Sequence, residues 1–125
     1  MTDNNKLLLV DDEKDIVTIL KAGLEQHGFK VDGYTNPKEA LDNFKPVYYE
    51  RIITDIRMPG ISGFELARQI YAKDPKAQIC FLTSFEILED EARKVFSTLP
   101  SYCFIKKPIT PTMLVQHLHN HIAAR

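Results

Sequence analysis

The amino-acid sequence predicts an α/β fold in which helices cover both faces of a single parallel sheet. Five apolar runs of strand length alternate with stretches whose apolar residues recur at helical spacing. This alternation favours parallel strands, because parallel neighbours need crossover helices and those crossovers are right-handed. We therefore predict a doubly wound, three-layer αβα fold with five strands in the order 2-1-3-4-5 and five helices.

The first two strands and helices are expected in residues 6–46. The run Lys6–Val10 is the first strand, and the helix after it carries apolar residues at spacing four. Gly28 supplies the left-handed residue that commonly ends a helix. Residues 29–34 alternate in polarity as a half-buried strand should. A cap residue followed by proline, Asn36-Pro37, opens a second helix that is expected to reach Pro46.

The third strand is expected at about residues 50 to 54, immediately before Asp55. A Met-Pro-Gly loop follows, and proline and glycine cannot continue a strand ladder. Ser62 and Glu65 have the spacing of a capping box at the start of the third helix. Asp55 is therefore predicted to lie at the carboxyl end of a buried strand.

The last two strands are expected in residues 78–105. The run Gln78–Thr83 is continuously apolar, which is typical of a strand covered on both faces. A fourth helix is expected between Ile87 and Leu99, and a fifth strand at residues 102–105. Thr110-Pro111 opens the last helix.

The length and charge of the chain limit its class. Residues 1–125 suit a single domain with a core over about residues 6–123, and no output domain is expected within them. The net charge of −1 favours neither nucleic acid nor a membrane surface as a partner. The first residues lack the pattern of a signal peptide, so we expect a cytoplasmic protein. Cys80 and Cys103 lie in apolar runs and are expected to be reduced thiols in the core.

Polar groups follow four of the expected strands at the point where each strand ends. They are the pair Asp11-Asp12, then Asp55, Thr83 and Lys107. The carboxyl ends of parallel strands meet at one edge of the sheet, and this strand order brings these four ends together at a switch point. A buried strand has no structural need for such groups. Their coincidence predicts a functional site.

The three carboxylates of this set repel one another, and a divalent cation or a lysine ammonium offsets that cost. Mg²⁺ prefers hard oxygen ligands and commonly binds through one or two carboxylates, which predicts a magnesium site at Asp12 and Asp55. A carboxylate can also act as a nucleophile toward phosphorus. We therefore predict that Asp55 accepts a phosphoryl group, while Lys107 and Thr83 bind its oxygens.

Each of these groups also has a plainer structural interpretation. The acids at positions 11–13 suit the first turn of a helix, and Asp55 suits a turn. Thr83 suits a cap, and Lys107 a solvated loop. We favour the functional interpretation because all of them converge on one sheet edge, where clustered carboxyl groups mark functional sites.

These residues resemble the motifs of the receiver domains of two-component response regulators. Leu9-Val10-Asp11-Asp12-Glu13 resembles the acidic pair of that family, and Asp55-Ile56-Arg57-Met58-Pro59-Gly60 with Gly63 resembles its phosphoacceptor loop. Leu82-Thr83-Ser84 resembles its switch hydroxyl, and Phe104-Ile105-Lys106-Lys107-Pro108 its aromatic residue and lysine. The resemblance covers nearly all of residues 6–123.

The resemblance implies a flavodoxin-like fold and transfer of a phosphoryl group to Asp55 from a phosphohistidine. The donor would be a sensor histidine kinase or a histidine phosphotransfer protein. The resemblance also implies that Asp12, Asp55 and the Arg57 carbonyl bind Mg²⁺, that Asp11 acts through water, and that the bond between Lys107 and Pro108 is cis.

For signal output, the resemblance implies that Thr83 and Phe104 move and alter the face made by the fourth helix, fifth strand and fifth helix. A downstream protein target or a separate output domain would read that face, and a phosphorylation-dependent homodimer stays open. The protein would catalyse only its own phosphorylation and dephosphorylation. Large side chains at Arg57 and Phe85, at positions that tune dephosphorylation in the family, are predicted to hinder the attacking water.

Other functions on such a fold fit these residues less well. An FMN carrier would need a phosphate cradle rich in small residues after the first strand, where this chain has acids. An aspartyl-phosphate phosphohydrolase should carry Asp-x-Asp, which Asp55-Ile56-Arg57 lacks. A protein-interaction domain that never takes phosphate stays open as the alternative, because it differs from a receiver domain only in its chemistry.

Overall fold

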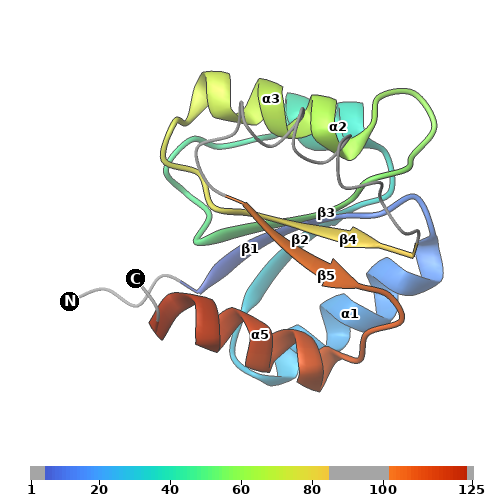
Figure 1. Ribbon diagram of the computed structural model, residues 1–125, viewed down its shortest axis with the longest axis vertical. Helices are drawn as coiled ribbons and strands as arrows, with labels where there is room; N and C mark the ends of the chain where they lie inside the picture. Colours follow the sequence, from blue (N-terminus) through green and yellow to red (C-terminus); the bar gives the residue numbers. More distant parts are fainter. Residues whose placement is uncertain (1–4, 85–101, 124–125) are drawn as a thin grey trace.

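The computed structural model describes residues 5–84 and 102–123, which form one parallel sheet between two layers of helices (Figure 1). The strands are β1 (Lys6–Val10), β2 (Lys30–Tyr34), β3 (Arg51–Asp55), β4 (Ile79–Thr83) and β5 (Tyr102–Lys106). Their order in the sheet is β2-β1-β3-β4-β5, and every neighbouring pair is parallel. The predicted topology and strand order are confirmed.

The described helices lie on both faces of this sheet. They are α1 (Lys14–Gln26), α2 (Pro37–Asp42), α3 (Gly63–Lys73) and α5 (Pro111–Ala123). Figure 1 shows α2 and α3 over one face and α1 with α5 over the other. The predicted fourth helix, between Ile87 and Leu99, lies outside the described residues. None of the described helices has both the length and the apolar character required to cross a membrane.

Within residues 5–84 and 102–123, two apolar clusters form the core, one on each face of the sheet. Alternate residues of each strand enter opposite clusters, as the twofold side-chain period of a strand requires. Leu8 and Ile52 pack with α3 residues such as Leu66, whereas the neighbouring Leu9 and Ile53 pack on the α1 and α5 side. All residues of β3 and β4 are buried, in agreement with strands that are covered on both faces.

Helix boundaries follow local hydrogen bonds. The Asn36 side chain caps α2 by accepting from the amides of Lys38 and Glu39. This helix ends at Asp42 rather than near Pro46, because the Asn43 side chain donates to the Glu39 carbonyl and competes with further helical bonds.

The cap of α3 matches the predicted capping box only in part. The Ser62 hydroxyl accepts from the Glu65 amide. The Glu65 carboxylate instead accepts hydrogen bonds from Arg68 and Gln69, the next residues on its own helix face. The start of α3 is therefore where the sequence predicted it, with one of the two expected cap bonds.

The register of β4 and β5 shows that one prediction was wrong. Cys80 lies directly opposite Cys103, with the two Cα atoms 4.5 Å apart, and the pair forms a disulfide rather than two reduced thiols. The apolar runs correctly predicted that both residues are buried. Burial does not indicate which residues of two neighbouring strands face each other, because that depends on register.

Candidate functional site

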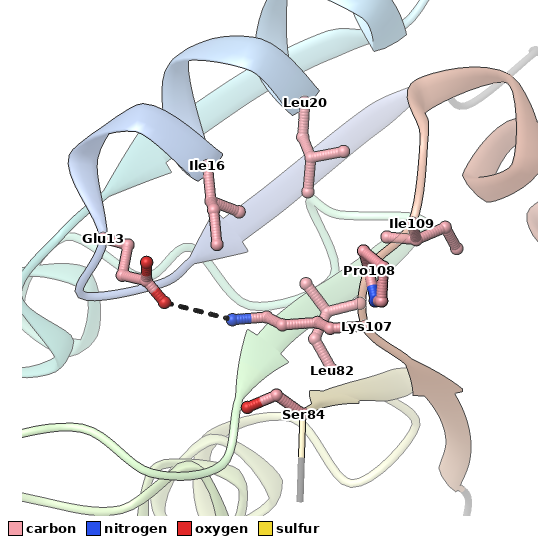
Figure 2. A pocket seen from close by; sticks show the side chains of 8 residues that line it. All are labelled: Glu13, Ile16, Leu20, Leu82, Ser84, Lys107, Pro108 and Ile109. Carbon is pink, nitrogen blue, oxygen red and sulfur yellow. Dashed lines mark ion pairs between the residues drawn. The ribbon is translucent and has the colours of Figure 1, made fainter.

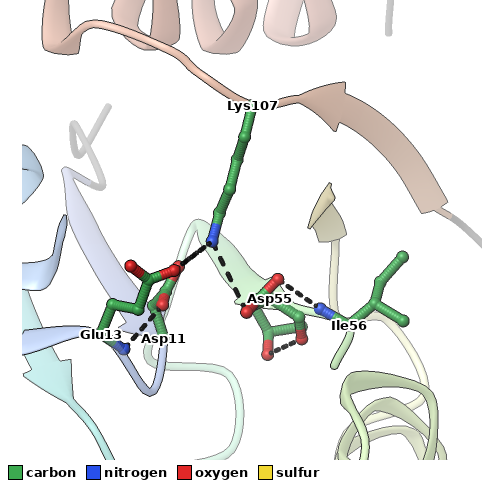
Figure 3. Close-up of polar contacts among 6 residues, drawn as sticks. Asp11, Glu13, Asp55, Ile56 and Lys107 are labelled. Atoms are coloured by element: carbon green, nitrogen blue, oxygen red, sulfur yellow. Dashed lines mark hydrogen bonds and ion pairs between the residues drawn. The ribbon is translucent and has the colours of Figure 1, made fainter. Parts of the chain in front are cut away.

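Three strand ends bring Asp11, Asp55 and Lys107 together at the carboxyl edge of the sheet (Figure 3). Asp11 directly follows β1, Asp55 is the last residue of β3, and Lys107 directly follows β5. Because all strands are parallel, these ends lie on the same edge. Residues distant in the sequence thus share one small polar cluster.

Lys107 reaches from the end of β5 into the space between the acids, as Figure 3 shows. Its Nζ lies 2.6 Å from Asp11 Oδ2, 3.5 Å from Asp55 Oδ2 and 4.0 Å from Glu13 Oε1. Burial opposes the ammonium charge, but the hydrogen bond and charge of Asp11, with smaller effects of Asp55 and Glu13, outweigh it and raise the pKa of Lys107. Lys107 is therefore a fixed positive charge within the cluster.

Asp55 is a buried carboxylate with incomplete compensation of its charge. Its Oδ1 accepts a hydrogen bond of 2.9 Å from the Ile56 amide, and its Oδ2 faces Lys107. Burial raises the pKa of Asp55 to about 6, and the charge of Asp11 adds to the rise, whereas Lys107 and the Ile56 amide oppose it. The carboxylate is mostly ionised at neutral pH and less stabilised than a carboxylate in water.

The backbone of Asp55 is held by close approach of the next helix. The Gly63 amide, at the start of α3, donates to the Ile56 carbonyl at 2.7 Å. A β-carbon on Gly63 would overlap the Asp55 carbonyl oxygen, so only glycine allows this approach. The Thr54 hydroxyl donates to the same Asp55 carbonyl. These contacts orient the end of β3.

The acids of the cluster offer a set of oxygen ligands. Asp11, Asp12 and Asp55 each present a carboxylate oxygen, and these oxygens lie within 4.8 Å of one another. Asp12 is exposed while the other two are buried, so a bound ion would keep a solvent-facing side. Hard oxygen ligands with room for water fit Mg²⁺ better than a metal that prefers thiols or imidazoles.

The other described residues named from the sequence lie at the end of β4, in β5 and in the loop after β3. Thr83 is buried at the end of β4, and its carbonyl accepts a 2.8 Å hydrogen bond from the Lys107 amide. Arg57 is exposed in the loop after β3. Phe104, in β5, is 36% exposed with its ring 6.0 Å from that of Phe81. The bond between Lys107 and Pro108 is cis, as the resemblance implied. Phe85 lies outside the described residues.

Two features of the site were not predicted. Asp11 has Lys107 as a close ion-pair partner, and Glu13 adds a weaker pair at the rim. The run of three acids was the sequence signal for Glu13. A pocket of about 440 Å³ also opens beside Lys107 (Figure 2). It is lined by Glu13, Ile16, Leu20, Leu82, Ser84, Lys107, Pro108 and Ile109.

A family model of the response regulator receiver domain matches residues 7–119. The chain belongs to this family. As a receiver domain, it is a signalling module of two-component systems. Receiver domains generally use Mg²⁺, and response regulators interact with sensor kinases and output domains.

Two regulators and one solved structure illustrate the relationship. Response regulator SaeR of Staphylococcus epidermidis is 35% identical over 117 residues, which are 94% of this receiver domain and 50% of that protein. The C4-dicarboxylate transport transcriptional regulatory protein DctD of Rhizobium meliloti is 32% identical over 110 residues, 88% of this chain and 24% of that protein. The receiver domain therefore spans half or less of these two curated relatives.

The solved structure is the non-phosphorylated HemR receiver domain from Leptospira biflexa. It superposes with a TM-score of 0.81 at 28% identity, covering 92% of this chain and 91% of that one. The likeness covers most of both chains, which agrees with the match of the family model.

Proposed function

We propose that Asp55 accepts a phosphoryl group from a phosphohistidine of a sensor histidine kinase or a histidine phosphotransfer protein. One observation carries this proposal. The buried Asp55 carboxylate lies 3.5 Å from the Lys107 ammonium and in a cluster of oxygens with Asp11 and Asp12. A lone turn carboxylate has no need of this combination of like charges and a buried lysine.

Asp55 is the nucleophile of the proposed transfer. The ionised carboxylate forms the new bond to phosphorus while the bond from phosphorus to the histidine nitrogen breaks, and that nitrogen keeps the electron pair. Because the pKa of Asp55 is about 6, no base is needed at neutral pH. The Ile56 amide holds one carboxylate oxygen, which limits rotation of the side chain during the attack.

Lys107 and Thr83 stabilise the charge of the transferred group. The Lys107 ammonium pairs with a phosphoryl oxygen, and the Thr83 hydroxyl donates a hydrogen bond to another. Asp11 positions Lys107 through their 2.6 Å ion pair. Asp12, Asp55 and the Arg57 carbonyl would hold Mg²⁺, with Asp11 acting through water, and the bound ion would further neutralise the phosphoryl oxygens. The domain catalyses only its own phosphorylation and dephosphorylation.

The output of the switch is a change at Thr83 and Phe104. Phosphate on Asp55 draws Thr83 toward it, and the partly exposed Phe104 ring turns inward beside β4. The altered surface includes β5 and α5 and is read by a downstream protein target or a separate output domain. The same surface would serve a phosphorylation-dependent homodimer. Phosphate shifts the population only by interacting better with one of the two packings.

The test is exposure of the 125-residue chain to acetyl phosphate with Mg²⁺, followed by mass spectrometry of the intact protein. We expect a gain of one phosphoryl group in the wild type and none in Asp55→Asn. Beryllofluoride should shift amide signals around Asp55 in the wild type but not in Asp55→Asn. Asp42→Asn, which changes an exposed acid outside the site, is the matched control and should behave as the wild type. Absence of a wild-type response would favour the interaction domain without phosphate chemistry.

A further inference from the structure

The Cys80–Cys103 disulfide joins the two strands whose ends carry Thr83 and Lys107. The two cysteines are opposite each other in the β4 and β5 ladder and belong to the core cluster on the α1 and α5 side. Cys80 is fully buried, and Cys103 is 7% exposed. The crosslink therefore lies inside the sheet, away from the cluster of acids.

A continuous strand ladder connects this bond to the site. Cys80 is three residues before Thr83, a span of roughly 10 Å along an extended strand. The ladder continues from the disulfide to Thr83 opposite Lys106, where the Lys107 amide donates to the Thr83 carbonyl. Phe104 directly follows Cys103 in β5. A change in the distance between Cys80 and Cys103 would therefore displace both Thr83 and Phe104.

We propose that the Cys80–Cys103 pair is a reversible oxidation site that controls how readily β4 and β5 rearrange when Asp55 is phosphorylated. This inference rests on the proposed function of Asp55. The disulfide is present in the packing in which Phe104 is partly exposed. A crosslink formed in one packing restricts the strands to arrangements that keep the two Cα atoms close, so the oxidised protein resists the inward shift of Phe104. Reduction removes that restriction.

The chemical step is exchange with a dithiol reductant. One thiolate of the reductant attacks Sγ of Cys103, the bond between the two protein sulfurs breaks, and Sγ of Cys80 leaves with the electron pair. The second thiolate of the reductant then attacks the mixed disulfide and releases Sγ of Cys103. The reductant becomes its own disulfide, and the two protein thiolates take up one proton each. A low-molecular-weight disulfide reverses the reaction.

The position of Cys103 makes this exchange compatible with a folded protein. β5 is the last strand in the order of the sheet and pairs with β4 on one side. Partial separation of an edge strand requires less free energy than global unfolding, and it would uncover the less buried of the two sulfurs. The motion that admits the reductant and the motion that phosphorylation requires involve the same pair of strands.

Thermodynamic reciprocity provides a sharp test. The oxidised and reduced forms of the full chain are titrated with beryllofluoride in the presence of Mg²⁺, and the amide signals of Thr83 and Phe104 are followed. We expect half-saturation at a concentration at least about fivefold lower in the reduced form. In a redox titration with oxidised and reduced dithiothreitol, beryllofluoride should favour the dithiol by the same factor.

The control is the double variant Cys80→Ala with Cys103→Ala, which should respond like the reduced protein and ignore the reductant. If it does not fold, Cys103→Ala alone replaces it, because this variant leaves the more deeply buried Cys80 intact. Alkylation in denaturant counts free thiols independently of phosphorylation.

Two results would overturn the coupling alone. They are two free thiols after treatment with a low-molecular-weight disulfide, or equal half-saturation by beryllofluoride in both redox forms. A protein that forms the disulfide but answers beryllofluoride in neither form would overturn the function of Asp55 and, with it, the coupling.

Discussion

Asp55 and Asp74 are equally buried, each 7% exposed, yet they lie in opposite chemical surroundings. Asp74, at the end of α3, accepts hydrogen bonds from the backbone amides of Val47 and Lys76 with its two oxygens. Asp55 accepts from one amide, faces Lys107 at 3.5 Å and is crowded by two further aspartates.

The difference separates a structural carboxylate from a functional one. Asp74 accepts hydrogen bonds from part-buried backbone amides of two loops, so its carboxylate contributes to stability. Asp55 carries a burial cost that its partners offset only in part, which is why its pKa is raised. The ionised Asp55 carboxylate therefore lowers the free energy of unfolding. A bound cation, or a phosphoryl group on Asp55, would remove part of this cost.

Removing the structural carboxylate should have the largest effect. We expect Asp74→Ala to lower the free energy of unfolding by about 3 kcal/mol, because two part-buried amide hydrogen bonds to a carboxylate are lost, and bonds to charged groups contribute about 1.5–3 kcal/mol each. Urea unfolding followed by circular dichroism measures this. Asp42→Ala, at an exposed position, is the control and should change stability by less than about 0.5 kcal/mol. Equal effects of the two changes would erase the distinction between these acids.

Removing the functional carboxylate should act in the opposite direction. We expect Asp55→Asn to raise the free energy of unfolding by up to about 3 kcal/mol near neutral pH, because folding raises the pKa of Asp55 from 3.8 to about 6 and one pKa unit corresponds to about 1.4 kcal/mol. Urea unfolding at several pH values measures it.

The pH dependence gives the sign of this effect. The folded-state pKa of Asp55, about 6, is above its unfolded value, so the folded protein binds the proton more tightly. Ionisation of Asp55 therefore costs stability progressively between about pH 4 and pH 6, and the full cost is present above that range. The advantage of Asp55→Asn should shrink toward zero below about pH 4. Mg²⁺ should stabilise the wild type more than this variant.

Variants of Val47 test whether its hydrogen bond to Asp74 holds the Val47 backbone in an unfavourable conformation. Val47 has a φ of 62° although it is β-branched, and it is 84% exposed. We expect Val47→Gly to raise the free energy of unfolding by about 1 kcal/mol, because glycine adopts this φ without strain. Val47→Ala keeps most of the conformational penalty and serves as the control. Calorimetry would contradict the prediction if both variants melted together below the wild type.

The smallest effect is expected at the rim of the functional carboxylate. Arg57→Ala should speed the loss of phosphate from Asp55 by less than about tenfold, because removing an exposed side chain two residues away gives water easier access. Phe85→Ala is predicted from the sequence to act in the same direction. The decay of phosphorylated protein, followed by intact mass, measures both. Unchanged decay in both variants would contradict the prediction.

The sequence by itself determined the topology and the identity of the candidate site residues. Apolar runs of strand length between amphipathic stretches are sufficient to predict a doubly wound parallel sheet. Asp11, Asp55 and Lys107 could be found because each lies at the end of an apolar run of strand length, and the carboxyl ends of parallel strands share one edge. Local sequence patterns indicate which residues are buried and whether the apolar residues recur at helix or strand spacing. This fold depends mainly on those two properties.

Only the tertiary structure decided which groups touch. It placed Cys80 opposite Cys103 and brought Lys107 closer to Asp11 than to Asp55. It also gave Asp74, at the end of α3, the backbone amides of two loops as hydrogen-bond donors. Register and side-chain partners depend on how segments distant in the sequence pack against each other, and no local pattern carries that information.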